Sequence, residues 1–193
     1  MAGSLLVVLA GCASTPWTNG RPSERTIAGA RSIEGRLSVR YKDLASDKED
    51  ALSGRFEWAQ SGDDIELSLL DPLGQTVALI RSDPNRSSIT FRDGRKVEGA
   101  TPEALTQDTL GWTVPLRGLG SWLAGRPAAG SAAVALDDGG IRQDNWTIRF
   151  VRDDDTLAGD AANRSPPKRI DLHYPGPPAE IDMRLVIDQR SGG

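Results

Sequence analysis

The chain of 193 residues has one cysteine and one histidine, and these are the first side chains to consider for chemistry. No disulfide can form within the chain, and a Cys/His zinc site, which needs about four ligands, cannot be assembled. Cys12 lies near the N-terminus, whereas His173 lies in an alternating run, Asp171-Leu-His-Tyr-Pro, that is typical of an ordinary strand. We therefore interpret His173 as structural and expect no Cys–His nucleophile pair.

Other motifs for catalysis, metals or nucleic acid are missing as well. The sequence contains neither a Gly-x-Ser-x-Gly nucleophile elbow nor a Walker-type phosphate loop. Three consecutive aspartates, 153–155, do not have the spacing of an EF-hand loop. The net charge of −4 lacks the basic excess of a nucleic-acid binder. The sequence predicts a protein that is not an enzyme and has no cofactor, metal site or nucleic-acid partner.

Cys12 is the residue with the clearest predicted chemistry. The apolar run 5–9 is too short to cross a bilayer of about 30 Å and fits the central region of a secretory signal. The following Leu9-Ala-Gly-Cys12 resembles the bacterial lipobox. This resemblance implies cleavage before Cys12 and acylation of its thiol and new amine; an adventitious terminal cysteine is the alternative. Ala13 follows the cysteine, at the position where an aspartate would retain a lipoprotein at the inner membrane. Its presence favours a location of this protein at the periplasmic face of the outer membrane.

These features divide the chain into three parts. Residues 1–11 are a signal-peptide remnant, 12–22 a lipidated N-terminus with a linker rich in small and polar residues, and 23–190 a single domain of ordinary size. A short helix is expected over 23–32. Apolar and polar residues then alternate, which predicts an antiparallel meander with one apolar face. Its expected strands cover 33–41, 52–58, 65–69, 75–81, 88–91 and 95–98, with an Asp-Gly hairpin turn at 93–94.

The middle of the chain predicts two helices. Thr101-Pro-Glu103 has the pattern of an N-cap, a first-turn proline and an acid, so a helix should run toward Leu110 and stop at Gly111. A second helix from Pro115 places four apolar residues on one stripe: Leu116, Leu119, Trp122 and Leu123. Two glycines within it cost roughly 1 kcal/mol each, which predicts a marginal, mobile lid. Strands are expected again over 132–136, 141–143, 146–151, 168–174 and 180–188, with a solvated loop before 168.

Several segments of the chain together resemble the LolB family of outer-membrane lipoprotein receptors. They are the lipobox and residues 35–39, 54–60, 69–76, 110–116, 122–127, 145–148 and 181–188. The resemblance implies an unclosed antiparallel barrel of about eleven strands with a helical lid over an apolar cavity. It also implies a LolA-like periplasmic carrier and acylated lipoprotein cargo as partners of a monomer at the outer membrane. The hairpin before Trp146 looks shortened, which could reduce the strand count.

The apolar face supplies candidates for an acyl-chain cavity. A short amphipathic lid over a half-barrel favours an apolar cavity over a catalytic cleft. For any one of these residues, the alternative is that its side chain simply fills a dry core. The candidates are Leu37, Phe56, Trp58, Ile65, Leu67, Leu69, Trp112, Leu116, Leu119, Trp122, Leu123, Trp146, Ile148, Phe150, Leu185 and Ile187.

The turn Asp71-Pro72-Leu73-Gly74 carries a leucine where turns normally carry polar residues. Pro72 fixes its own φ and Gly74 permits a positive φ, so together they can push Leu73 outward. A leucine folded back onto the core is the alternative. By resemblance, the leucine of this loop is exposed and delivers cargo into the membrane, which makes Pro72, Leu73 and Gly74 a membrane-insertion loop.

The expected function is acceptance of acylated lipoproteins from the carrier and their insertion into the outer membrane. An acyl chain of roughly fifteen methylenes loses on the order of 12 kcal/mol in water, so it must pass between sheltered sites. Without a nucleotide-binding motif, a downhill series of affinities has to drive the transfer. Two alternatives remain: a glycerolipid-binding lipoprotein of similar fold, and a structural lipoprotein of an outer-membrane assembly complex that uses an exposed sheet edge.

Overall fold

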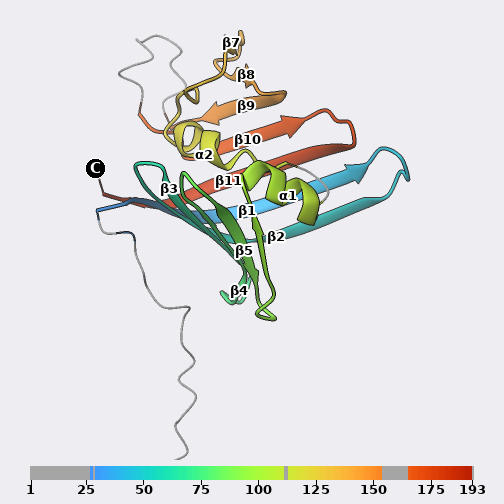
Figure 1. Ribbon diagram of the computed structural model, residues 1–193. Helices are drawn as coiled ribbons and strands as arrows, with labels where there is room; N and C mark the ends of the chain where they lie inside the picture. The colour runs from blue at the N-terminus through green and yellow to red at the C-terminus, as the bar shows by residue number, and fades with distance from the viewer. Residues whose placement is uncertain (1–26, 28, 111–112, 154–164, 193) are drawn as a thin grey trace, which may run out of the picture.

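The computed structural model describes residues 27, 29–110, 113–153 and 165–192. Eleven antiparallel strands form one sheet in the order β6-β5-β4-β3-β2-β1-β11-β10-β9-β8-β7 (Figure 1). The strands are β1 Arg31–Asp43, β2 Glu49–Ser61, β3 Asp64–Leu70, β4 Thr76–Ser82, β5 Ser87–Phe91, β6 Lys96–Gly99, β7 Ala133–Ala135, β8 Ile141–Gln143, β9 Trp146–Val151, β10 Arg169–Tyr174 and β11 Ala179–Ser191.

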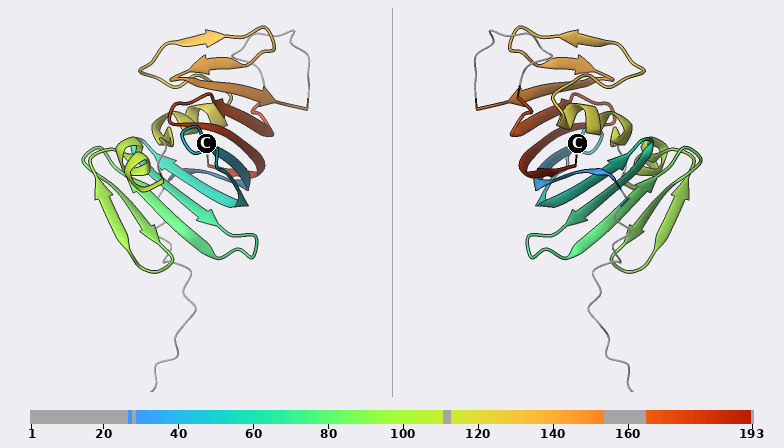
Figure 2. Two further views of the ribbon diagram at one scale, coloured as in Figure 1. Left: turned by 90° about the vertical axis from the view of Figure 1, so that its right-hand side faces the viewer. Right: turned by 90° about the vertical axis from the view of Figure 1, so that its left-hand side faces the viewer.

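The first and last strands of the chain lie side by side in the middle of the sheet. β1 pairs with β2 on one side and with β11 on the other, over almost its whole length. Each half then continues outward as a meander of neighbouring strands to the edges β6 and β7, which do not pair with each other. The sheet curves around the two helices (Figure 2). The predicted unclosed antiparallel barrel of about eleven strands is therefore confirmed.

Strand pairing explains where the local expectations differ from the structure. The helix expected over 23–32 is wrong at its described end, because Arg31 and Ser32 already pair with β2. The long central strands also continue into the polar residues expected to form a loop, since Lys42 still pairs with Glu49. The hairpin before Trp146 is short, with three residues in each of β7 and β8, but both strands are retained.

The two predicted helices are present on the apolar face of the sheet. α1 spans Pro102–Leu110, and the hydroxyl of Thr101 accepts a hydrogen bond from the Ala104 amide at 3.2 Å, as its capping role requires. α2 spans Leu116–Leu123 and follows Pro115. Gly111, the expected stop of the first helix, lies outside the described residues. Neither described helix is long and apolar enough to cross a membrane.

A β-bulge interrupts the central pairing of the sheet at Gly35. Glu34 pairs with Gln189 but Gly35 pairs with Ile187, so Asp188 has no opposite residue on β1. A Cβ atom on Gly35 would lie 2.0 Å from the Val186 carbonyl oxygen and 2.8 Å from the Phe56 ring. Because bulges increase local twist and bend, this close approach helps the sheet to curve around the helices.

Gly35→Ala should therefore lower the free energy of unfolding by about 2 kcal/mol or more, because the new methyl group collides with backbone. Ser38→Ala, at an exposed position of the same strand, is the matched control and should stay within about 0.5 kcal/mol of the parent. Urea unfolding followed by tryptophan fluorescence measures both. Equal stability of the two variants would show that the bulge tolerates a side chain.

Candidate functional site

The apolar side chains of the sheet and lid meet in one continuous cluster. Most of the predicted cavity residues are buried in it. The buried ones are Leu37, Phe56, Trp58, Ile65, Leu67, Leu116, Leu119, Trp122, Leu123, Trp146, Ile148 and Leu185. Leu69, Phe150 and Ile187 are partly buried and pack against the cluster, whereas Trp112 lies outside the described residues. The opening of this cluster to admit an acyl chain stays a prediction.

The predicted cavity residues do not include several members of the same cluster. They include Ile33, Val39, Ile80, Ile89, Leu105, Ile141, Ile170, Leu172 and Ile181. Most of them occupy inward positions of strands that were expected, so the same alternation of polar and apolar residues could have identified them. Their presence extends the apolar face across both halves of the sheet.

Helix α2 lies directly on this apolar face. Its predicted stripe is confirmed, because Leu116, Trp122 and Leu123 are fully buried and Leu119 nearly so. Its glycines have a packing role in addition to their cost in helix propensity. A Cβ atom on Gly120 would lie 2.3 Å from the Gln60 amide oxygen and 3.2 Å from the Trp58 ring. Glycine therefore allows α2 to approach β2 closely.

A buried glutamine links α2 to the β7–β9 side of the sheet. Gln143 occupies an inward position of β8 and is 1% exposed. Its amide oxygen accepts hydrogen bonds from Trp122 Nε1 at 2.9 Å and from the Ala128 amide at 2.8 Å. Its amide nitrogen donates to the Ala128 carbonyl at 2.9 Å and to the Ser131 carbonyl at 3.0 Å. Both ends of this buried amide are satisfied, so the network stabilises one position of the helix.

A second polar link holds the C-terminal end of α2. Arg190, near the end of β11, donates hydrogen bonds from Nη2 to the Leu123 carbonyl at 2.9 Å and to the Pro167 carbonyl at 2.7 Å. Partial burial lowers the pKa of this guanidinium from its ordinary value, but an arginine stays charged at physiological pH. A cation at the last carbonyls of a helix is favourable because those carbonyls lack helical partners.

The loop with Leu73 is fixed by Asp71 and presents its leucine to solvent. The Asp71 carboxylate accepts hydrogen bonds from the Leu73 amide at 3.0 Å and the Gln75 amide at 2.9 Å, and it pairs with Arg92. The Gln75 amide and then Arg92 hold the pKa of Asp71 below its ordinary value. Leu73 is 84% exposed, so the alternative of a leucine folded onto the core is wrong. The membrane role of Pro72, Leu73 and Gly74 stays a prediction.

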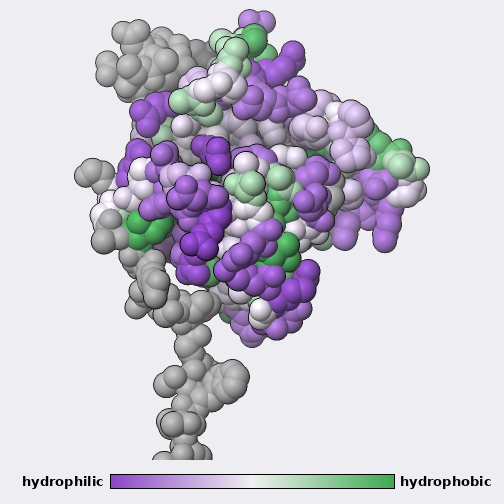
Figure 3. All heavy atoms as spheres, in the orientation of Figure 1, coloured by the Kyte–Doolittle hydropathy of each residue, from purple (hydrophilic) through white to green (hydrophobic). Residues whose placement is uncertain are grey.

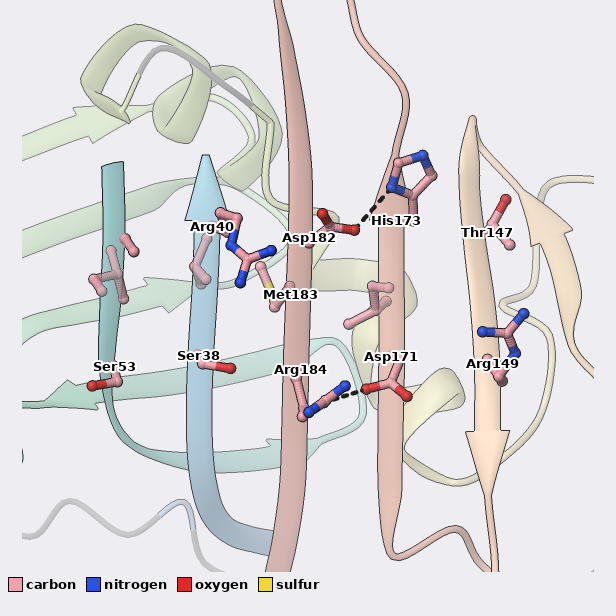
Figure 4. Close-up of a pocket in the computed structure, with 14 residues that line it drawn as sticks. Ser38, Arg40, Ser53, Thr147, Arg149, Asp171, His173, Asp182, Met183 and Arg184 are labelled. Carbon is pink, nitrogen blue, oxygen red and sulfur yellow. Dashed lines mark hydrogen bonds and ion pairs between the residues drawn. The ribbon is translucent and has the colours of Figure 1, made fainter. Parts of the chain in front are cut away.

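The opposite, polar face of the sheet contains a groove of about 610 Å³ (Figure 4). Paired charges line part of it, including Arg184 with Asp171 at 2.7 Å and His173 Nδ1 with Asp182 at 3.0 Å. Ser38 and Ser53 lie lower on the sheet in this view, away from His173. His173, Glu180 and Asp182 each offer a ligand atom within 4.8 Å of the others; the first two are half-buried and Asp182 is exposed. This geometry does not unite a nucleophile with a base.

Comparison with known proteins gives this geometry a family. A family model described as "Outer membrane lipoprotein LolB" matches residues 30–189. The chain belongs to the LolB family. It is 33% identical to the outer-membrane lipoprotein LolB of Bordetella petrii, over 98% of this chain and 91% of that protein. LolB of Ralstonia nicotianae is 32% identical, with 97% and 93% covered, and LolB of Cupriavidus pinatubonensis is 30% identical, with 94% and 89% covered.

The Gln143 network predicts a large stability effect in this LolB-family domain. Gln143→Leu should lower the free energy of unfolding by about 2–4 kcal/mol, since the Trp122 and Ala128 donors would lose their buried acceptor. Gln189→Leu, at an exposed position of β11, is the matched control and should change little. Chemical unfolding of both variants measures the difference. A Gln143→Leu variant as stable as its control would show that the network does not hold α2.

Proposed function

We propose that this protein is an outer-membrane lipoprotein that accepts acylated lipoproteins from a LolA-like periplasmic carrier and inserts them into the outer membrane. The observation that carries this proposal is the apolar face of an unclosed sheet, covered by two short helices. In Figure 3 the covered side is mainly polar at its surface, with separate hydrophobic patches. The apolar face is thus kept from water by a small cover that an acyl chain can replace.

The energetics of an acyl chain require such a sheltered face. Exposing a chain of roughly fifteen methylenes to water costs on the order of 12 kcal/mol of free energy, so the chain does not diffuse freely through the periplasm. Transfer therefore has to run from the carrier to this domain and then to the bilayer with little exposure at each step. Because each site can hand over to one of higher affinity, the proposal requires no nucleotide hydrolysis.

The proposed lipid on Cys12 locates the domain at the membrane, as the names of its relatives suggest. Cys12 itself lies outside the described residues. The chain enters the sheet at Arg31, which pairs with Gln60, whereas Leu70, just before the exposed loop, pairs with Arg55. The loop therefore lies at the far end of β3, beside the middle of β2 and five positions along β2 from the tether. Residues 13–31 can span at most about 65 Å, which is enough for the loop to face the bilayer.

Leu73→Glu should block release of cargo into membranes while leaving folding and acceptance of cargo nearly intact. One leucine entering lipid contributes roughly 1.5–3 kcal/mol, so release should fall about tenfold or more. Val134→Glu, which charges another exposed apolar residue at the distant edge strand β7, is the matched control. Acceptance from a loaded carrier and release to liposomes are measured separately. Loss of acceptance with normal release per bound cargo would contradict the insertion role.

Cys12→Ala should give a soluble periplasmic domain that still accepts cargo, because the apolar face does not require the anchor. Co-purification with a triacylated lipopeptide, identified by mass spectrometry, measures this. A variant that binds no acylated peptide would make the anchor part of the site. Recovery of glycerolipids alone would favour the alternative glycerolipid-binding function over lipoprotein transfer.

A further inference from the structure

The two helices of the lid are held to the sheet by different kinds of contact. Polar groups on both sides hold α2: the buried Gln143 of β8 through Trp122, and the partly buried guanidinium of Arg190 of β11 through the Leu123 carbonyl. The backbone of α2 also approaches β2 directly at Gly120. Moving α2 off the sheet would leave the buried Trp122 Nε1 donor without its Gln143 acceptor, at a cost of about 1–3 kcal/mol.

Helix α1, in contrast, rests on the β4–β6 part of the sheet through apolar packing. Leu105 is 2% exposed, and its Cβ and Cδ1 atoms would each lie 3.3 Å from a Cβ atom on Gly99 of β6. The sheet side of this contact is an apolar wall of inward side chains from three strands. The wall consists of Ala78, Ile80, Ile89, Phe91 and Val97. Figure 2 shows α1 beside these strands, whereas α2 lies nearer the middle of the sheet.

Two polar contacts of α1 lie within the lid segment itself. The buried Thr106 hydroxyl accepts a hydrogen bond from the Val114 amide at 2.9 Å, and the Thr113 hydroxyl donates to Gln107 at 3.1 Å. These bonds connect α1 to the residues just before α2, so they can persist when α1 leaves the wall. An acyl chain that takes the place of Leu105 exchanges one apolar contact for another, which is nearly neutral in free energy.

We propose that the acyl chain enters under α1, between this helix and the β4–β6 wall, while α2 remains fixed on the sheet. The inference rests on the proposed function and adds which helix opens and where the chain first binds. Gln143 is then a positioning residue: it keeps α2 as a permanent boundary of the site. The wall of β4–β6 is the first subsite for an acyl chain.

The structure offers two matched disulfides that test this proposal in a Cys12→Ala background. Cβ atoms at positions 99 and 105 would lie 3.3 Å apart, and so would those at positions 118 and 128. Both separations are close to the range of about 3.5–4.5 Å found in disulfides. Gly99→Cys with Leu105→Cys closes α1 onto β6. Gly118→Cys with Ala128→Cys joins α2 to the segment that Gln143 already holds.

Binding of a fluorescent palmitoylated peptide is measured for both double variants, oxidised and reduced, after circular dichroism and thermal melting show that all four forms are folded. Oxidation of the 99–105 pair should weaken binding by about tenfold or more, since it depletes the open state. Dithiothreitol should restore the binding. Oxidation of the 118–128 pair should leave the affinity within about twofold.

Other outcomes separate the two proposals. Strong loss of binding in both oxidised pairs, or only in the 118–128 pair, would show that α2 moves and would overturn the inference. Unchanged binding in the oxidised 99–105 pair would overturn it as well. Failure of the parent and of the folded, reduced variants to bind the palmitoylated peptide would instead contradict the proposed function, and the inference would fall with it. Should the Leu105 substitution prevent folding, Gly99→Ala offers a second test, because its methyl group would lie 3.3 Å from Leu105 and should loosen α1 without filling the subsite. Raised affinity for the palmitoylated peptide is expected, and unchanged or lower affinity would overturn the inference.

Discussion

The structure depends on one constraint: a sheet with a single apolar face has to withdraw that face from water. The sheet is not closed, and α1 and α2 are the described helices that lie on it. Full burial of Leu116, Trp122 and Leu123 shows how completely the second helix meets this need. Burial of each such side chain contributes roughly 1.5–3 kcal/mol, so the cover has a substantial part in stability. The same surface that stabilises the fold is therefore the surface proposed for cargo.

Polar groups inside an apolar cover decide which of its parts can move. A hydrogen bond adds only about 1 kcal/mol net when formed, but a buried group that loses its partner costs the full desolvation. Gln143 accepts a buried hydrogen bond from Trp122 of α2 and also binds Ala128 in the segment that follows, so displacement of α2 would break a buried hydrogen bond. Leu105 on Gly99 has no such directional requirement, since apolar contacts can be exchanged one for another. This difference assigns rigidity and exchange to different helices of one small lid.

Local sequence signals predicted most helices and strands of this fold. The predictions failed where contacts between distant parts of the chain decide the structure. The stripe of α2, the cap at Thr101 and the outward position of Leu73 each depend on a few neighbouring residues. The helix expected at Arg31 and Ser32 failed because pairing with β2 outweighs local propensity. Gln143 could be noticed only as a polar residue at an inward strand position. Its partner Trp122 is 21 residues earlier, and only the folded sheet brings the two together.

Under the proposed function, transfer without nucleotide hydrolysis requires that this domain hold its cargo less tightly than the bilayer does, and the cover supplies a physical reason. In the unloaded state the lid already satisfies the apolar face, so an acyl chain must compete with Leu105 and its neighbours for the same wall. The apparent affinity is then the affinity of the open state multiplied by the fraction of molecules that are open. A bilayer has no such competing cover. On this proposal, the contacts that keep the empty domain stable lower its affinity for cargo, and they make release into the membrane the downhill step.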